Sequence, residues 1–185
     1  GSVGWDSPVV FVCALASLTL LPLLIFIERR TPHPVLDLRL FRNSSFLLGQ
    51  TALAFSFLAQ GSVMYLTPFY FSGGLGMTSF NIGLLLATFS VMRLLISPIS
   101  GLINDLVGGR TPVTIGLLTL ALGIFILSQQ GAEANLTLVI LGMVLAGLGS
   151  ALFEPPNTRH ILKSLPQEQW GTGSASVAAG RQISA

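Results

Sequence analysis

The sequence predicts an all-α membrane protein, a polytopic bundle of transmembrane helices, and two observations lead to this fold class. Of the 185 residues, 51% are hydrophobic and only 9% are charged, with a mean hydropathy of +0.78. A soluble domain normally carries about 25% charged residues, so this chain has too few charges to cover a surface in water. The apolar residues also come in runs of about 20, the length of helix that crosses the hydrocarbon core of a bilayer.

Five apolar runs and the start of a sixth define the expected spans. They cover residues 8–27, 45–71, 80–103, 112–130 and 136–162, and the sixth begins near residue 171. Prolines lie inside several of them, among them Pro68 in the second and Pro98 in the third, and the pair Pro155-Pro156 interrupts the fifth. Membrane helices tolerate such prolines when neighbours or water satisfy the freed carbonyl groups. The run starts offer N-cap residues: Ser44 or Ser45, Ser79 and Thr111.

Basic residues occur in alternate loops only. The basic loops are residues 28–43, 104–111 and 159–169, which carry Arg29, Arg30, Arg39, Arg42, Arg110, Arg159 and Lys163. The loops 72–78 and 131–135 carry no Arg or Lys. This alternation is the positive-inside pattern of a chain that crosses the membrane repeatedly. We therefore expect a multi-pass protein of the cytoplasmic membrane, with the basic loops in the cytoplasm and the start of the chain outside.

The first basic loop, residues 28–44, is also amphipathic. Its segment 35–42 follows Pro32 and Pro34 and alternates arginines with leucines and a phenylalanine. Such a segment is typical of a short helix that lies in the interface, with its arginines toward the lipid headgroups.

Several function classes are excluded by what the chain lacks. Cys13 is the single cysteine, and His33 and His160 are isolated, so no metal-site spacing exists. There is no Ser/His/Asp set and no phosphate-binding loop, so we expect no enzyme and no cofactor. The net charge of +2 comes from basic residues spread between apolar runs, which argues against nucleic acid as a partner.

Two charged residues fall inside the predicted spans, Arg93 and Glu154. Intramembrane charges are costly and mark functional sites by default. Each lies about nine or ten residues before the same-side end of its helix, which at about 1.5 Å per residue places both at a similar depth. They are therefore candidates for an ion pair that lines or gates a cavity. Two alternatives stay open: Glu154 faces a water-filled cavity without a partner, or Arg93 extends to the headgroups.

Other residues around these charges are further candidates for a cavity. Pro155 and Pro156 bend the helix beside Glu154, Asn157 offers a hydrogen bond, and Arg181 lies in the unfinished sixth span. Aromatic and thioether side chains in the second run are candidates for stacking on a flat apolar molecule, although packing against lipid or other helices is the favoured interpretation for each of them. They are Phe55, Phe57, Met64, Tyr65, Phe69 and Tyr70.

The turn between the third and fourth runs carries the sharpest motif. In residues 101–110, Asp105 near a helix end and Arg110 just beyond it can form a charge-assisted contact that latches neighbouring helices. An ordinary polar turn is the alternative. The stretch resembles the G-x-L-x-D-R-x-G-R-R loop of the major facilitator superfamily. Gly101, Asp105, Gly108 and Arg110 match that loop, whereas Leu106 and Gly109 stand at usually basic positions.

Further stretches resemble the fourteen-helix drug:proton antiporters of this superfamily. Residues 4–8 and 28–42 are similar to the segment before the C-terminal half of these antiporters. Residues 153–157, 171–175 and 181–182 are similar to their later helices. The resemblance covers the whole chain in order.

The resemblance implies a partial major facilitator fold with about five complete spans and a truncated sixth. Residues 1–27 would hold the outside end and a linker transmembrane helix, 28–44 the basic cytoplasmic loop, and 45–185 an incomplete C-terminal six-helix bundle. The N-terminal helical bundle would be missing from this fragment.

The resemblance also implies a function. The intact protein would exchange protons for small hydrophobic or cationic drugs, in contact with membrane lipid, by alternating access. Two other interpretations stay open: a transporter of another small solute, and a non-transporting truncated membrane module.

Overall fold

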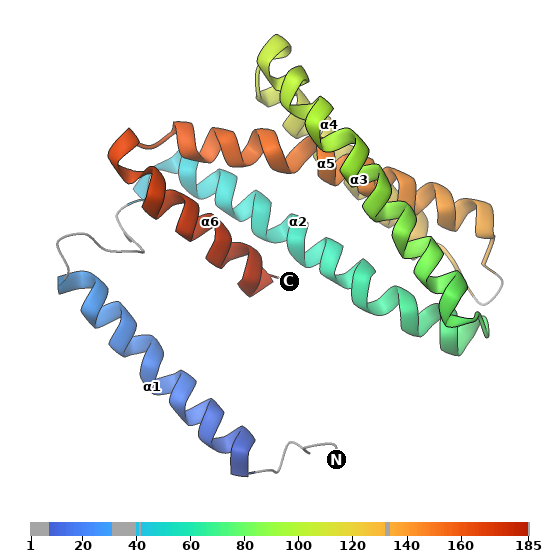
Figure 1. Ribbon diagram of the computed structural model, residues 1–185, viewed down its shortest axis with the longest axis horizontal. Coiled ribbons are helices and arrows are strands. Elements are labelled where there is room, and N and C mark those ends of the chain that lie inside the picture. Colours follow the sequence, from blue (N-terminus) through green and yellow to red (C-terminus); the bar gives the residue numbers. More distant parts are fainter. Residues whose placement is uncertain (1–7, 31–39, 41, 132–133, 185) are drawn as a thin grey trace.

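The computed structural model describes residues 8–30, 40, 42–131 and 134–184, and they are helical almost throughout (Figure 1). In order, the elements are α1 (Pro8–Arg30), α2 (Ser44–Phe69), the π-helical turn η2 (Tyr70–Gly74), α3 (Ser79–Val107), α4 (Arg110–Ser128), α5 (Leu136–Lys163), the 3₁₀ turn η3 (Gln167–Gln169) and α6 (Trp170–Ser184). The predicted all-α fold class is confirmed, and the described residues contain no strand.

The helix ends differ from the expected ones by a few residues. Asn43, not Ser44 or Ser45, caps α2, and its side-chain oxygen accepts the N–H of Ser45 at 3.0 Å. Thr78 rather than Ser79 caps α3, because the helix already includes Ser79. The helix α4 begins at Arg110 without a side-chain cap, so Thr111 lies inside it. The Pro155-Pro156 pair does not interrupt α5, which continues to Lys163.

The first basic loop is shorter than residues 28–44, since α1 extends to Arg30 and α2 starts at Ser44. Of the expected interfacial helix at residues 35–42, only residues 40 and 42 are described, and the start of the chain at residues 1–7 also lies outside the described residues.

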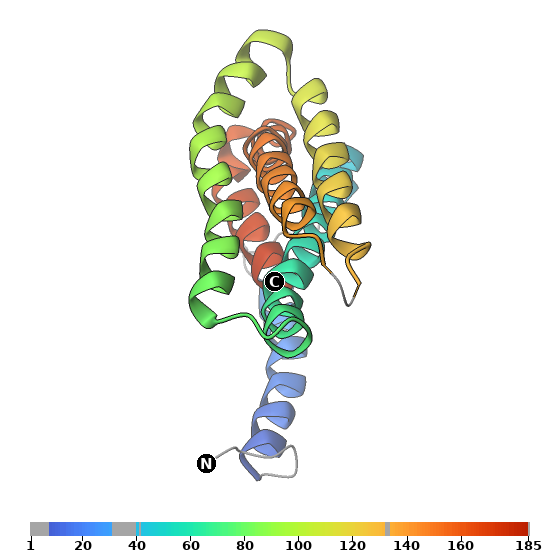
Figure 2. The same ribbon diagram turned by 90° about the vertical axis from the view of Figure 1, so that its right-hand side faces the viewer.

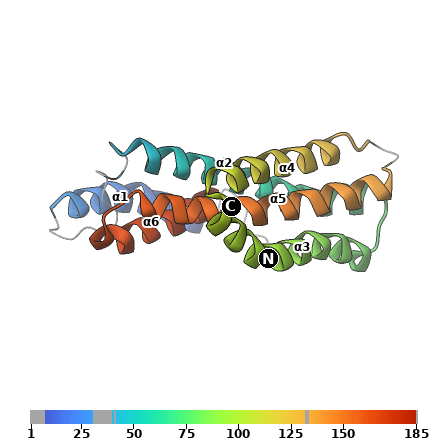
Figure 3. The same cartoon turned by 90° about the horizontal axis from the view of Figure 1, so that it is seen from above.

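The helix α5 lies at the centre of the bundle. Figures 2 and 3 show it between α3 and α4, and α2 and α6 also pack against it. In the most apolar 18-residue stretch of α5, 50% of the residues are buried, compared with 11% in the corresponding stretch of α3. A side chain on α5 is therefore the one best placed to contact several other helices at once.

Two hydrophobic clusters hold these helices to α5. One gathers buried residues of η2, α3, α4 and α5: Phe71, Ile82, Leu85, Phe89, Leu120, Val139, Met143 and Ala146. The other joins the start of α2 to α5 and α6: Leu40, Phe46, Leu53, Phe153, Ile161, Leu165 and Val177. The clusters occupy opposite ends of α5, and Glu154 lies next to Phe153 of the second.

Small residues allow α4 and α5 to pack closely. A Cβ atom on Gly123 would lie 2.5 Å from the backbone nitrogen of Ala146, and one on Gly116 would lie 2.6 Å from that of Phe153. Both facing positions are on α5, where the sequence shows small residues at four-residue spacing. Such spacing lets membrane helices approach backbone to backbone.

The outer surface of the bundle is apolar. Four helical stretches among the described residues are long and apolar enough to cross a membrane: Ser44–Gly74, Ser79–Val107, Arg110–Ser128 and Leu136–Lys163. Large side chains on them are exposed, for example Phe55 by 72% and Phe80 by 79%. So large an exposed apolar surface is typical of a protein that lies in a membrane. The helix α1 has 23 residues and stands apart from the other helices in Figures 1 and 2.

Candidate functional site

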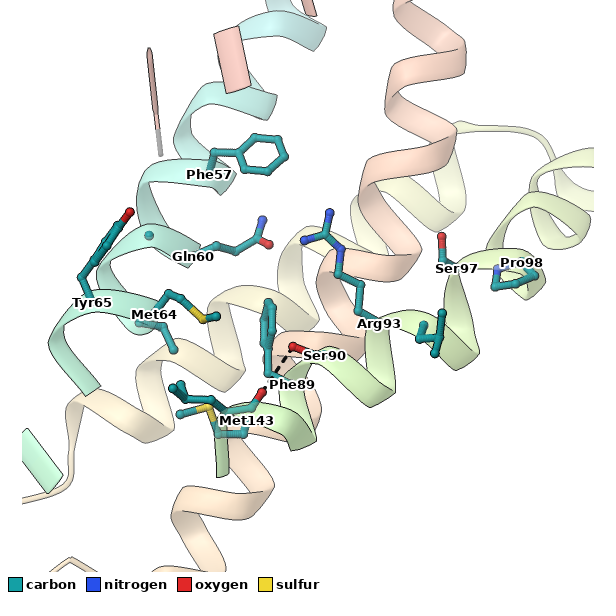
Figure 4. Close-up of a pocket in the computed structure, with 14 residues that line it drawn as sticks. Phe57, Gln60, Met64, Tyr65, Phe89, Ser90, Arg93, Ser97, Pro98 and Met143 are labelled. Carbon is teal, nitrogen blue, oxygen red and sulfur yellow. Dashed lines mark hydrogen bonds between the residues drawn. The ribbon is translucent and has the colours of Figure 1, made fainter. Parts of the chain in front are cut away.

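A cavity of about 640 Å³ opens between α2 and α3 (Figure 4). It exists because both helices pack against α5 but have almost no contact with each other. Most of its lining is aromatic, aliphatic or thioether, including Phe57, Met64, Tyr65, Phe89 and Met143. Binding sites for small molecules have volumes of about 300–1,000 Å³ and mostly apolar walls, so both its size and its lining fit such a site.

One wall of the cavity contains Arg93, which forms an ion pair with a buried glutamate behind it. Arg93 reaches from α3 to α5, where its guanidinium Nη2 contacts Oε2 of Glu154. Glu154 is only 4% exposed, whereas the side chain of Arg93 is 39% exposed and lines the cavity. The depth argument from the sequence left pairing as one of three alternatives, and the structure brings these two side chains together.

Gln60 on α2 completes this polar cluster. Its Nε2 donates a hydrogen bond to Oε1 of Glu154 at 3.1 Å and another to the carbonyl oxygen of Ser56 at 3.1 Å. Figure 4 shows Gln60 and Arg93 pointing toward each other from the two sides of the cavity. The carboxylate of Glu154 thus links α2 to α3 across α5, at the place where α2 and α3 themselves separate.

Arg181 on α6 lies behind the cavity wall. Its Nη2 donates to Oγ1 of Thr158 at 3.3 Å, and its guanidinium lies 5.5 Å from the centre of the Phe57 ring. It is close enough to Glu154 for the two charges to interact. Arg181 therefore adds positive charge to the site without lining the cavity.

The neighbours of Glu154 on α5 serve packing instead. Asn157 is buried, and its Nδ2 donates to the carbonyl oxygen of Gly49 on α2 at 3.0 Å. Pro156 is also buried, Pro155 is partly buried, and neither proline lines the cavity. Of the residues singled out around Glu154, Arg93 alone belongs to the cavity lining.

The turn between α3 and α4 differs from the expected latch. Asp105 accepts a hydrogen bond from Nη1 of Arg159 on α5 at 2.5 Å, and it forms no hydrogen bond or ion pair with Arg110. The reason is the shape of the turn: Gly108 adopts φ +80°, and Arg110 becomes the exposed first residue of α4. The contact therefore connects α3 to α5 rather than α3 to α4. Gly101 lies one turn before Asp105 on α3, with open space around it.

Some of the aromatic and thioether candidates line the cavity, and others lie on the outer surface. Phe57, Met64 and Tyr65 line the cavity, whereas Phe55 and Phe69 are 72% and 75% exposed outside it. Tyr70 instead donates a hydrogen bond from its hydroxyl to the carbonyl oxygen of Gly131.

Sequence reasoning missed Gln60, Phe89 and Met143. The sequence offered one signal for Gln60, namely a polar amide inside an apolar run. No signal distinguished Phe89 or Met143 from the other apolar residues of their helices.

The fold and the cavity together define a class of membrane transport protein, and comparison with known proteins places the chain in it. Residues 1–185 match the family model of the Major Facilitator Superfamily, so the chain belongs to this superfamily. The superfamily consists of transporters and not of enzymes. The chain is accordingly a multi-pass membrane protein of a transporter family.

Several curated proteins are similar over nearly the whole chain. The multidrug resistance protein Stp of Mycobacterium tuberculosis H37Rv is 31% identical over 183 residues, which are 98% of this chain and 34% of Stp. The lincomycin resistance protein LmrB of Listeria monocytogenes is 29% identical, covering 100% and 39%. The riboflavin transporter RibZ of Clostridioides difficile is 26% identical, covering 92% and 37%. The chain thus spans between a third and two fifths of the length of these relatives.

Proposed function

We propose that this chain forms part of a proton-coupled transporter that exports hydrophobic drugs across the cytoplasmic membrane by alternating access. The observation that carries the proposal is the cavity between α2 and α3, in which an apolar aromatic lining meets the Arg93–Glu154 ion pair. The lining suits a hydrophobic solute. The buried carboxylate suits a group that gains or loses a proton as the helices move.

The proposed coupling step follows from the contacts of Glu154. As a carboxylate it holds Arg93 of α3 and Gln60 of α2 at the same time. A proton on Glu154 would cancel its charge and weaken its hold on Arg93, because the Coulomb attraction between the two opposite charges would be lost. The helices α2 and α3, which have almost no other contact, would then be free to separate or close. Protonation would in this way shift the balance between two states of the cavity.

The proposed orientation places the basic loops in the cytoplasm. Arg110 and Arg159 lie at the end of the bundle where α3, α4 and α5 meet, and the positive-inside rule assigns this end to the cytoplasm. The contact between Asp105 and Arg159 would hold α3 against α5 at that end, and its release would accompany opening of the cavity to the cytoplasm.

The names of the relatives support drug export and also leave room for another solute. Stp and LmrB are described as resistance proteins, whereas RibZ is described as a riboflavin transporter. The second candidate function is therefore transport of another small solute with a flat aromatic body, which would fit the same cavity.

The test is transport in proteoliposomes with an imposed pH gradient. The 185-residue chain is compared with a longer protein that includes the helices encoded beside it. We expect the longer protein to move a hydrophobic drug against its gradient, and a protonophore to stop this transport. The proposal fails if the longer protein moves no drug, or if its rate of drug transport does not depend on the pH gradient. Drug transport by the short chain alone would contradict its role as a part of the transporter.

A further inference from the structure

We infer that the cavity between α2 and α3 selects organic anions: molecules with a flat apolar body and one carboxylate or similar oxygen group that binds Arg93. The inference deepens the proposed function and rests on it, because it takes the cavity as the site of the transported solute. It also narrows the substrate class, since it argues against the lipophilic cations that the sequence leaves open.

The charges around the cavity are unbalanced. Two guanidinium groups, of Arg93 and Arg181, stand against the single carboxylate of Glu154, which gives a net charge of +1 when all three are ionised. No other Asp, Glu, Lys or Arg of the described residues is in the cavity lining. In a membrane interior this excess positive charge is poorly screened, so a ligand of negative charge would be attracted and a cation repelled.

The carboxylate of Glu154 is not available to a cationic ligand. Its two oxygens are engaged by Gln60 and by Arg93, and the residue is 4% exposed and absent from the cavity lining. A cation in the cavity would therefore meet the positive side of the ion pair rather than the negative one.

The guanidinium group of Arg93, by contrast, is open to the cavity. Its contact with Glu154 uses Nη2, and no other hydrogen bond joins Arg93 to the described residues. An arginine offers five N–H donors in a planar fork that matches a carboxylate. Because the side chain is 39% exposed and lines the cavity, its remaining donors can reach an oxygen acceptor there.

The remaining lining suits a flat apolar body. The rings of Phe57, Tyr65 and Phe89 and the thioethers of Met64 and Met143 line the cavity, and Figure 4 shows these side chains around the same space as Arg93. Aromatic rings and sulfur make favourable contacts with aromatic faces. An aromatic carboxylate is therefore the simplest ligand that satisfies both the walls and the charge.

The test compares three ligands that share one ring system: 2-naphthoate, 2-naphthamide and 2-naphthylmethylammonium. The 185-residue chain is placed in nanodiscs of phosphatidylcholine, a lipid without net charge, and empty nanodiscs give the background. Each ligand competes with radiolabelled 2-naphthoate in equilibrium dialysis at neutral pH. We expect the anion to compete about tenfold better than the ammonium compound, a ratio that one charge-assisted hydrogen bond supplies. The amide should lie between them.

Matched variants assign the preference to Arg93. R93Q should remove the preference, whereas R110Q, which neutralises an exposed arginine outside the cavity, should keep it. If R93Q does not fold, as judged by circular dichroism, R93Q/E154Q takes its place. It removes the donors of Arg93 while Arg181 keeps the net charge of the site at +1, so it should lose most of the preference if the donors of Arg93 bind the anion. The inference is overturned if the ammonium compound competes as well as 2-naphthoate, if none of the ligands binds the folded chain, or if R93Q/E154Q keeps the full wild-type preference.

The two proposals fail separately in these experiments. Anion-selective binding without transport by the longer protein would retain the inference and remove the proposed function. Proton-driven transport by the longer protein, without an anion preference in ligand binding, would retain the proposed function and overturn the inference.

Discussion

Glu154 is the residue on which the site depends, because its carboxylate joins two helices that otherwise hardly meet. Gln60 of α2 and Arg93 of α3 both bind it, and it is buried on the central helix α5. A buried charge of this kind contributes little to stability as long as it is paired, but it is costly to leave unpaired. The contacts therefore make the site sensitive to any change in the charge of Glu154.

A double-mutant cycle measures this dependence at the scale of residues. R93M and E154Q, alone and together, should show a coupling energy of about 1–3 kcal/mol, because R93M alone leaves a buried carboxylate without its ionic partner. The exposed pair Asp105–Arg159, with side chains 57% and 48% exposed, provides the control and should couple by less than about 1 kcal/mol. Unfolding in mixed detergent micelles gives the free energies. Equal coupling in the two pairs would contradict the central place of Glu154.

The sequence predicts part of this site and not the rest. Charges inside apolar runs identify Arg93 and Glu154, and counting residues from the helix ends places them at one depth. Gln60 was missed because an amide in a membrane helix has no charge to single it out. The partner of Asp105 was assigned to Arg110, its neighbour in the chain, whereas Arg159 is 54 residues away and becomes its partner only through the packing of α3 on α5.

At the scale of helices, α4 and α5 depend on glycines at their interface. G123A should destabilise the bundle by about 1–3 kcal/mol, since its new methyl group would lie 2.5 Å from the backbone of Ala146, which cannot move alone. G83A on α3, where nothing lies within 4 Å, is the matched control and should be neutral or slightly stabilising. Thermal unfolding in detergent measures both. A G123A protein as stable as G83A would contradict the close packing.

Chemical cross-linking tests which helix Asp105 contacts. With Cys13 replaced by serine, the pair D105C/R159C should be joined rapidly by a bifunctional thiol reagent about as long as an arginine side chain, because the side chain of Arg159 spans the distance from α5 to Asp105 on α3. The pair D105C/R110C should react much more slowly, since Arg110 starts α4 and forms no hydrogen bond or ion pair with Asp105. Electrophoresis after protease cleavage between the helices separates the two results. Faster reaction of the second pair would restore the latch expected from the sequence.

Helix positions were more predictable than helix details. The apolar runs located every helix to within a few residues, because length and hydropathy alone decide where a chain can cross a membrane. The π-helical turn Tyr70–Gly74, whose first residue Tyr70 contacts Gly131, had no such signal. It adds five residues to the span of α2 beyond Phe69, three of them past the expected end at residue 71.

At the scale of the whole molecule, the fold class followed from composition, and the superfamily followed from the turn motif and its neighbours. The arrangement of the other helices around α5 did not follow from the sequence. The spacing of apolar residues shows which face of a helix is apolar but not which helix packs against that face. The two hydrophobic clusters at opposite ends of α5 join it to different helices, which the sequence does not show.

Cysteine labelling tests the proposed orientation of the molecule. In a chain without Cys13, L106C near the end of α3 should react with a membrane-impermeant maleimide only after the cells are opened. G73C, in the turn η2 at the end of the bundle without basic residues, should react in intact cells. Both positions are exposed, and a side chain at residue 73 meets nothing within 4 Å. The opposite labelling pattern would mean that the basic loops lie outside.

Proton-driven drug transport measures the central claim most directly, in a protein that includes this chain and the helices encoded beside it. Wild type, the uncharged double variant R93Q/E154Q and the control R110Q are reconstituted in equal amounts, and drug uptake is followed under an imposed pH gradient. The account predicts that the double variant loses gradient-driven transport by about tenfold or more, as expected when a charged group that acts in the transported state is removed, while R110Q retains it. Transport by R93Q/E154Q at the wild-type rate would contradict the account.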